Sequence, residues 1–124
     1  MCIRDRQIIL YLPEGERQEL SLQLLHYLLK KRRIKVIYLG GDITLADVSD
    51  AVSILKPDYI FTMITETYVG NSVNSYVFQM RKLFPEVHLL LSGYQVVAQG
   101  VLNTQNITVL KSLDETIAHI DQLV

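Results

Sequence analysis

Short apolar runs alternate along this chain with stretches in which apolar residues recur at every third or fourth position. The first run, residues 7–12, is rich in Ile and Leu and is closed by Pro13 and Gly15. A short apolar run that ends in turn residues is typical of a strand buried on both faces. From Glu16 the spacing changes and predicts an amphipathic helix. Its predicted core face consists of Leu20, Leu24, Leu25, Tyr27 and Leu28.

The same alternation continues to the end of the chain. Buried strands are predicted at residues 34–39, 59–64, 87–91 and 107–110. The helix after the second strand should begin at Thr44 as N-cap, with Asp47 at the capping-box position. The predicted core residues of the second and third helices are Leu45, Val48, Val52 and Leu55, then Val73, Val77, Met80 and Leu83. A short helix is expected around residues 95–101, and a closing helix at residues 113–123.

Strand and helix therefore alternate five times. This order predicts a three-layer α/β domain with a doubly wound, five-stranded parallel sheet in the flavodoxin-like order 2-1-3-4-5. In such sheets a ligand binds outside the carboxyl ends of the strands. We therefore expect one functional edge, formed by residues 13–18, 40–43, 62–65 and 92–94.

Three segments at this edge carry a resemblance to a known family. The run P-E-G-E-R-Q-E-L-S-L, followed by V-I-Y-L-G-G-D-I and L-S-G-Y-Q-V, resembles the cobalamin-binding domain at the C-terminus of certain MerR-type transcriptional regulators. The wider family has Asp/Glu-x-His-x-x-Gly in the first segment, and its His is the lower axial ligand of cobalt. The corresponding residues here are Glu16, Gln18 and Ser21. The resemblance thus implies a cobalamin site that keeps the acidic residue but changes the ligand and the glycine.

The resemblance also implies which residues of the other turns would contact cobalamin. The family places a Leu-Gly turn beside the corrin and a small hydroxyl residue, near the end of the third strand, beside the nucleotide tail. Met63 stands at the hydroxyl position. The full set of implied contacts beyond the first segment is Gly40, Asp42, Ile43, Thr62, Met63, Thr65, Ser92, Gly93 and Tyr94.

Some of these residues also have ordinary structural explanations. Threonine at a strand end is a common strand former, so Thr62 and Thr65 fit either role. Ser92 and Tyr94 stand where the family often has Gly-Gly and a small residue. Tyr94 would either stack on a flat ligand or fill an empty pocket.

Composition sets broad limits on the function. The chain has 124 residues, a net charge of -1 and a single cysteine, Cys2. This length suits one domain, for which we expect residues 7–124, with residues 1–6 as a linker or artefactual leader. The small net charge gives no electrostatic drive toward nucleic acid or an anionic membrane. The basic residues 30–33 fit a helix C-terminus better than a nucleic-acid patch. No signal peptide or membrane span is visible, so a cytoplasmic protein is expected.

Other chemistry has little support in the sequence. His26, His88 and His119 fall on three different predicted elements and lack metal-ligand spacing. His26 lies eight residues beyond Gln18, which is ~12 Å along a helix, so it cannot replace the missing ligand. Walker, C-x-x-C and G-x-S-x-G motifs are absent. A phosphoacceptor receiver would carry acidic residues where this chain has Pro13 and residues 62–65.

Two functions remain open on the sequence. The first is the ligand-sensing or oligomerising module of a MerR-type regulator, with DNA bound only through a helix-turn-helix domain absent from this chain. The second is the cobalamin-binding part of a corrinoid methyltransferase or mutase. Such enzymes need the axial histidine more than a sensor does, so Gln18 favours regulation. We then expect no catalysis, weak or absent cobalamin binding, and a homo-oligomer for which Tyr68, Tyr76 and Tyr94 are candidate contacts.

Overall fold

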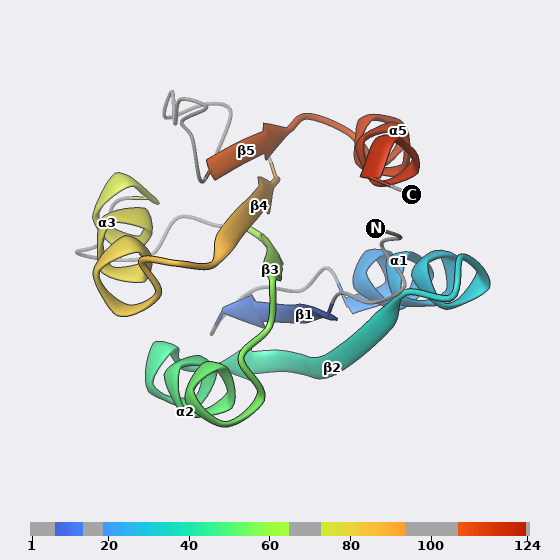
Figure 1. Cartoon of the computed structure of the whole chain (residues 1–124). Helices are drawn as coiled ribbons and strands as arrows, with labels where there is room; N and C mark the ends of the chain where they lie inside the picture. The colour runs from blue at the N-terminus through green and yellow to red at the C-terminus, as the bar shows by residue number, and fades with distance from the viewer. Residues whose placement is uncertain (1–6, 14–18, 65–72, 94–106, 124) are drawn as a thin grey trace.

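The computed structural model describes residues 7–13, 19–64, 73–93 and 107–123. Its strands form one parallel sheet in the order β2-β1-β3-β4-β5, which confirms the predicted fold class and strand order (Figure 1). The strands are β1 (Gln7–Pro13), β2 (Lys35–Ile43), β3 (Tyr59–Met63), β4 (His88–Ser92) and β5 (Ile107–Leu110). The helices are α1 (Glu19–Lys31), α2 (Leu45–Leu55), α3 (Val73–Leu83) and α5 (Leu113–Leu123). Among these helices, none is long and apolar enough to cross a membrane.

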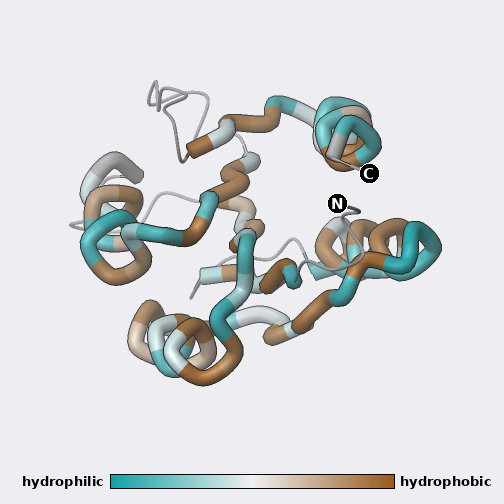
Figure 2. Tube along the Cα trace, in the orientation of Figure 1, coloured by the Kyte–Doolittle hydropathy of each residue, from teal (hydrophilic) through white to brown (hydrophobic). Residues whose placement is uncertain are grey.

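The sheet separates two apolar layers. Helices α1 and α5 cover one face, and α2 and α3 cover the other (Figure 1). Successive residues of a strand point to opposite faces, so Leu10 packs toward α1 while Tyr11 packs toward α3. Figure 2 shows the apolar residues concentrated on the strands and interspersed with polar residues around the helices. The two layers pack against both faces of the central strands and thereby position the carboxyl ends of these strands.

The predicted core face of α1 is largely wrong. Leu20, Leu24 and Tyr27 are 81%, 45% and 58% exposed. The buried residues of this helix are Leu22, Leu25 and Leu29. The helix carries apolar residues on two opposite sides, and spacing alone does not tell which side meets the sheet.

The last turns of α2 and α3 also differ from the prediction. Val48, Val77 and Met80 are buried as predicted, but Leu55 and Leu83 are exposed. Beyond α3 the buried residue is Phe84, whose backbone N–H donates to the Met80 carbonyl over 2.8 Å. The core stripe therefore runs from Met80 to Phe84 with a spacing of four, which leaves Leu83 on the outside.

Residues 40–43, which lie beyond the predicted end of the second strand at residue 39, instead belong to β2. The strand continues to Ile43, and its pairing with β1 shifts register twice beside this segment. Gly40 and Asp42 have positive φ angles of 90° and 54°, the conformation of an irregular, bulged strand. Thr44 then caps α2, because its Oγ1 accepts a hydrogen bond from the Asp47 N–H over 3.1 Å. The N-cap prediction is confirmed.

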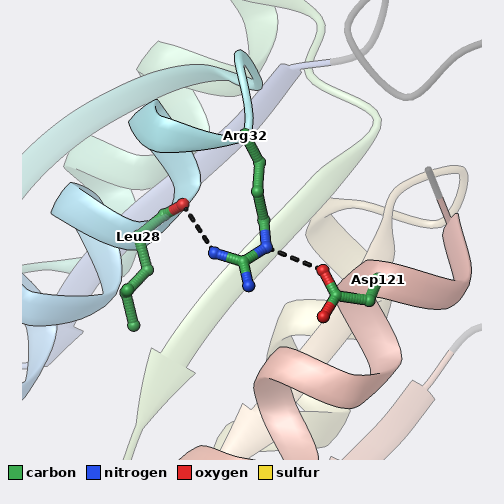
Figure 3. A network of polar contacts seen from close by, with 3 residues as sticks. All are labelled: Leu28, Arg32 and Asp121. Atoms are coloured by element: carbon green, nitrogen blue, oxygen red, sulfur yellow. Dashed lines mark hydrogen bonds and ion pairs between the residues drawn. The ribbon is translucent and has the colours of Figure 1, made fainter.

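Helices α1 and α5 are joined by a polar contact just beyond the end of α1. The Arg32 Nε–H donates to Asp121 Oδ1 over 2.7 Å, and its Nη1–H donates to the Leu28 carbonyl over 3.1 Å (Figure 3). The hydrogen bond from Arg32 lowers the pKa of Asp121, and the same bond raises the pKa of Arg32. Arg32, one of the four basic residues at positions 30–33, is therefore engaged within the chain.

Candidate functional site

The carboxyl ends of the strands lie along one edge of the sheet. Pro13 pairs with Ile43, and Met63 pairs with Ser92, which in turn pairs with Leu110. The described members of the predicted functional segments therefore lie at this carboxyl edge. The predicted contacts that lie outside the described residues are Glu16, Gln18, Thr65 and Tyr94.

The candidate contacts on β3 and β4 point to opposite faces of the sheet. Met63 packs in the apolar layer beneath α1 and α5. Thr62 alternates with it and shares the face of Ile60, toward α3. By the same alternation, Ser92 shares the face of Leu90, toward α1. A ligand on the α1 side of the sheet would thus meet Met63 and Ser92, and Thr62 could not take the place of Met63.

The buried hydroxyl of Thr62 is an unsatisfied polar group within the described part of the chain. Its side chain is fully buried, and Oγ1 has no hydrogen-bond partner within the described part of the chain. Leaving such a group unsatisfied costs about 1 to 3 kcal/mol. An ordered water or a polar ligand atom would remove this cost. Thr62 therefore remains a candidate for a polar contact on the α3 side of the edge.

Tyr11 is the neighbour of Thr62 on β1 and has a partner of its own. The two residues are paired in the sheet. The hydroxyls of Tyr11 and Tyr76 are 2.8 Å apart, and Tyr11 also donates to the Met80 sulfur over 3.7 Å. Tyr76 is half-buried and packs against the core. The structure thus gives Tyr76 a role in attaching α3 to the sheet. Tyr68 and Tyr94, the other two tyrosines predicted at an interface, lie outside the described residues.

Gly93 is required by the packing of the protein itself. Its φ is +109°, and a Cβ atom there would lie 2.4 Å from the Ile64 carbonyl oxygen. The Ile64 N–H donates to the Ser92 carbonyl over 2.8 Å, which draws the chain after β3 against the end of β4. The close backbone approach that glycine permits is therefore made to Ile64.

The first turn of α1 lies against the bulged end of β2. A Cβ atom on Gly41 would lie 2.6 Å from Glu19 Oε1, so this carboxylate borders the carboxyl edge. Gly40, in contrast, has only Tyr38 Cε1 near its would-be Cβ, at 3.7 Å. Asp42 is exposed, and Ile43 packs toward α2. Gly40 and Asp42 thus remain accessible from the edge, while the side chain of Ile43 belongs to the core.

Ser21 lies on α1, one turn after the segment that contains Gln18. It is half-buried. The next residue, Leu22, is buried in the layer between α1 and the sheet, which also contains Leu12 from the end of β1.

The described histidines do not supply a ligand at the carboxyl edge. His26 stacks on Tyr38 with ring centroids 4.8 Å apart, and burial followed by the charge of Lys30 lowers its pKa. His88 begins β4 at the opposite edge, where its Nε2 lies 2.8 Å from Thr108 Oγ1. Burial, together with His119, lowers the pKa of His88.

The residues described at the carboxyl edge do not form a metal site of their own. Within the described ranges, no group of three or more His, Cys, Asp or Glu side chains is placed to hold a metal ion. Position 18, which carries the ligand in the family's motif, is a glutamine. An amide is a poor substitute for the imidazole nitrogen that cobalt takes in that motif. A glutamine at position 18 would therefore not give histidine ligation to cobalamin.

A groove lies at the amino-terminal ends of the strands, opposite the carboxyl edge. It has a volume of about 790 Å³ and lies beside the ends of α2 and α3 and the starts of β3 and β4. Its charged or titratable lining residues are Lys56, Asp58, Tyr59, Glu86 and His88. No motif in the sequence marks this groove, because it is formed by the ends of two helices and the starts of two strands. It is separate from the carboxyl edge.

Comparison with known proteins supports the fold. No protein-family profile and no curated protein matches the chain. Among solved structures, the crystal structure of a cobalamin-binding protein from Desulfitobacterium hafniense DCB-2 superposes with a TM-score of 0.73 at 15% sequence identity. The match covers 98% of this chain and 60% of that one, so this chain spans less than two thirds of the other protein. At this identity the likeness shows that the two proteins share a fold.

Proposed function

We propose that this chain is the ligand-sensing and association module of a MerR-type transcriptional regulator. Its cobalamin-type site, in this proposal, has lost histidine ligation. The observation that carries the proposal is the carboxyl edge itself: the fold is that of a cobalamin-binding protein, yet position 18 is a glutamine. Two of the described histidines are engaged elsewhere: His26 stacks on Tyr38, and His88 lies beside Thr108 at the start of β4.

A regulatory role accounts for the loss of the ligand better than catalysis does. A cobalamin-binding subunit of a corrinoid methyltransferase or mutase would use the axial ligand in its chemistry. A sensor needs only a difference in affinity between two states of the protein. We therefore propose that the module itself has no catalytic activity. DNA would be bound by a separate helix-turn-helix domain, and the expected location is the cytoplasm, where such a regulator meets DNA.

The residues at the edge favour weak cobalamin binding or none. Gln18 offers an amide in place of imidazole. Ser21 adds a side chain where the family has glycine, and overpacking of this kind typically costs ~1 to 3 kcal/mol. That cost corresponds to roughly a tenfold to hundredfold loss of affinity.

The proposal is tested by mixing the protein with hydroxocobalamin and passing the mixture through a gel-filtration column. We expect little cobalamin to elute with the protein, and any bound fraction to lack the absorbance spectrum of histidine-ligated cobalamin. Stoichiometric co-elution with a histidine-ligated spectrum would refute the loss of ligation. The same column, run without cobalamin over a range of protein concentrations, tests association independently.

A further inference from the structure

We propose that the outer face of α1 is the surface on which a second copy of this chain docks. This face, the outer stripe, consists of Leu20, Leu24, Tyr27 and Lys31. The inference rests on the proposed function, in which the module acts by association, and it adds the surface and the partner.

The outer stripe is an apolar side of α1 that the sheet does not cover. Leu20 is 81% exposed and Tyr27 is 58% exposed, whereas Leu22, Leu25 and Leu29 fill the layer beneath the helix. At 100° per residue, the stripe lies almost diametrically opposite the buried side. A helix that is apolar on both sides is typical of one that is covered on both sides. Within the described part of the chain, α1 has only the sheet side covered in this way.

The spacing of the stripe suits packing against another helix. Leu20, Leu24, Tyr27 and Lys31 follow one another at intervals of four, three and four residues. This is the alternation of the a and d positions along a helix–helix seam. The Lys31 ammonium lies 5.7 Å from the centre of the Tyr27 ring, so the stem of this lysine extends the apolar surface to the end of the helix. The seam therefore runs over nearly the whole length of α1.

Charge favours a second α1 helix in antiparallel orientation. Glu19 lies in the first turn of α1, and Lys30 and Lys31 lie in its last turn. Glu19 and Lys30 fall on the same flank of the stripe at 100° per residue. An antiparallel pair centred near Leu24 would place the acidic first turn of each copy, whose Glu19 carboxylate lies beside Gly41, near the basic last turn of the other copy. It would also oppose the two helix dipoles. Such a contact is isologous and closes as a dimer.

The first experiment is sedimentation of Leu24→Glu beside wild type and a control, Ile54→Glu. Ile54 is 78% exposed on α2 and lies outside the stripe. We expect wild type and Ile54→Glu to dimerise with equal strength. Leu24→Glu should raise the dissociation constant by roughly tenfold or more, because a carboxylate would be buried in the seam without a partner. Circular dichroism of each variant checks that the fold is retained.

The second experiment maps the orientation by oxidative cross-linking in a Cys2→Ser background. Leu24→Cys should cross-link efficiently, because residues near a twofold axis face their own copies within disulfide reach. A mixture of Leu20→Cys and Tyr27→Cys chains should give the mixed product in preference to either homodimer. Ile54→Cys is the matched control and should cross-link much less.

The possible outcomes distinguish the proposal that the outer stripe is the docking surface from the proposal that the chain self-associates. A wild-type dimer that Leu24→Glu leaves intact, with no Leu24→Cys cross-link, would overturn the surface and leave association standing. A wild type that remains monomeric at the highest concentrations would overturn both. Preferential cross-linking of the Leu20→Cys homodimer would overturn the antiparallel arrangement.

Discussion

Gly93 illustrates how a single residue fixes the end of a strand. Its φ of +109° lies in the region that favours glycine, and the Ile64 backbone occupies the space of a side chain. A glycine at this position was apparent from the sequence, but its contact was not, because the approach joins two segments some thirty residues apart. The protein's own backbone therefore needs a glycine at position 93, in addition to the ligand contact that the resemblance implies there.

We predict that Gly93→Ala destabilises the protein more than Gly40→Ala does. Both positions have positive φ, but an added Cβ at Gly40 would meet only Tyr38 Cε1 at an ordinary 3.7 Å. Backbone strain typically costs about 1 to 3 kcal/mol at each position, and the overlap with Ile64 adds to it at Gly93. Urea unfolding of the two variants measures the difference. Equal losses would show that the Ile64 contact relaxes without cost.

His88 should make the folded state sensitive to mild acid. Burial lowers its pKa first, and the charge of His119 lowers it further. The unfolded chain then takes up a proton at a higher pH than the folded protein does, so stability should fall as the pH drops below about 6.5. We predict that His88→Gln, which retains a polar group facing Thr108, reduces this loss between pH 7 and pH 5. Thermal melting across that range measures it.

A control separates His88 from the other histidine with a lowered pKa. His26 is affected by burial and by Lys30, so it contributes in the same direction. His26→Gln should therefore remove a different part of the pH dependence, and the two substitutions together should remove more than either alone. A profile that His88→Gln leaves unchanged would contradict the assignment.

At the scale of elements, α1 shows which features a sequence predicts and which it does not. The strands could be predicted because short apolar runs bounded by turn residues are typical of buried strands. The buried side of α1 was missed because leucines line both sides of the helix, and only contact with β1 and β3 selects Leu22, Leu25 and Leu29. The second strand is longer than predicted, because Gly40 and Gly41 are typical of a turn, whereas a bulged strand uses the same positive φ angles at Gly40 and Asp42.

Because Leu22 faces the sheet and Leu20 faces outward, the two leucines should contribute differently to the free energy of unfolding. Leu22→Ala should cost about 2 to 5 kcal/mol, because it leaves a cavity between the helix and the sheet. Leu20→Ala should change the free energy of unfolding by no more than about 0.5 kcal/mol, because Leu20 is exposed. Urea unfolding of dilute protein, in which association contributes little, measures both. A larger loss of stability for Leu20→Ala than for Leu22→Ala would indicate that the side of α1 predicted from spacing faces the sheet.

For the whole molecule, the order of strands and helices along the chain was a better guide to the fold than any sequence motif. Five alternations of strand and helix predicted the sheet order 2-1-3-4-5, and the parallel register then placed Ile43, Met63 and Ser92 along one edge. The faces to which these residues point required the structure, because a single register step exchanges Thr62 and Met63 between the two sides. The chemistry of the edge still rests on Gln18 and Ser21, which the sequence identified through the family's motif.

The central claim is that the carboxyl edge is a cobalamin-type site that has lost its ligand. Hydroxocobalamin titration of wild type beside Gln18→His with Ser21→Gly, followed by absorbance, tests it most directly. The account predicts weak or no binding to wild type, and recovered binding with a histidine-ligated spectrum in the double variant. Histidine-ligated binding by wild type, or failure of the double variant to bind at all, would contradict it.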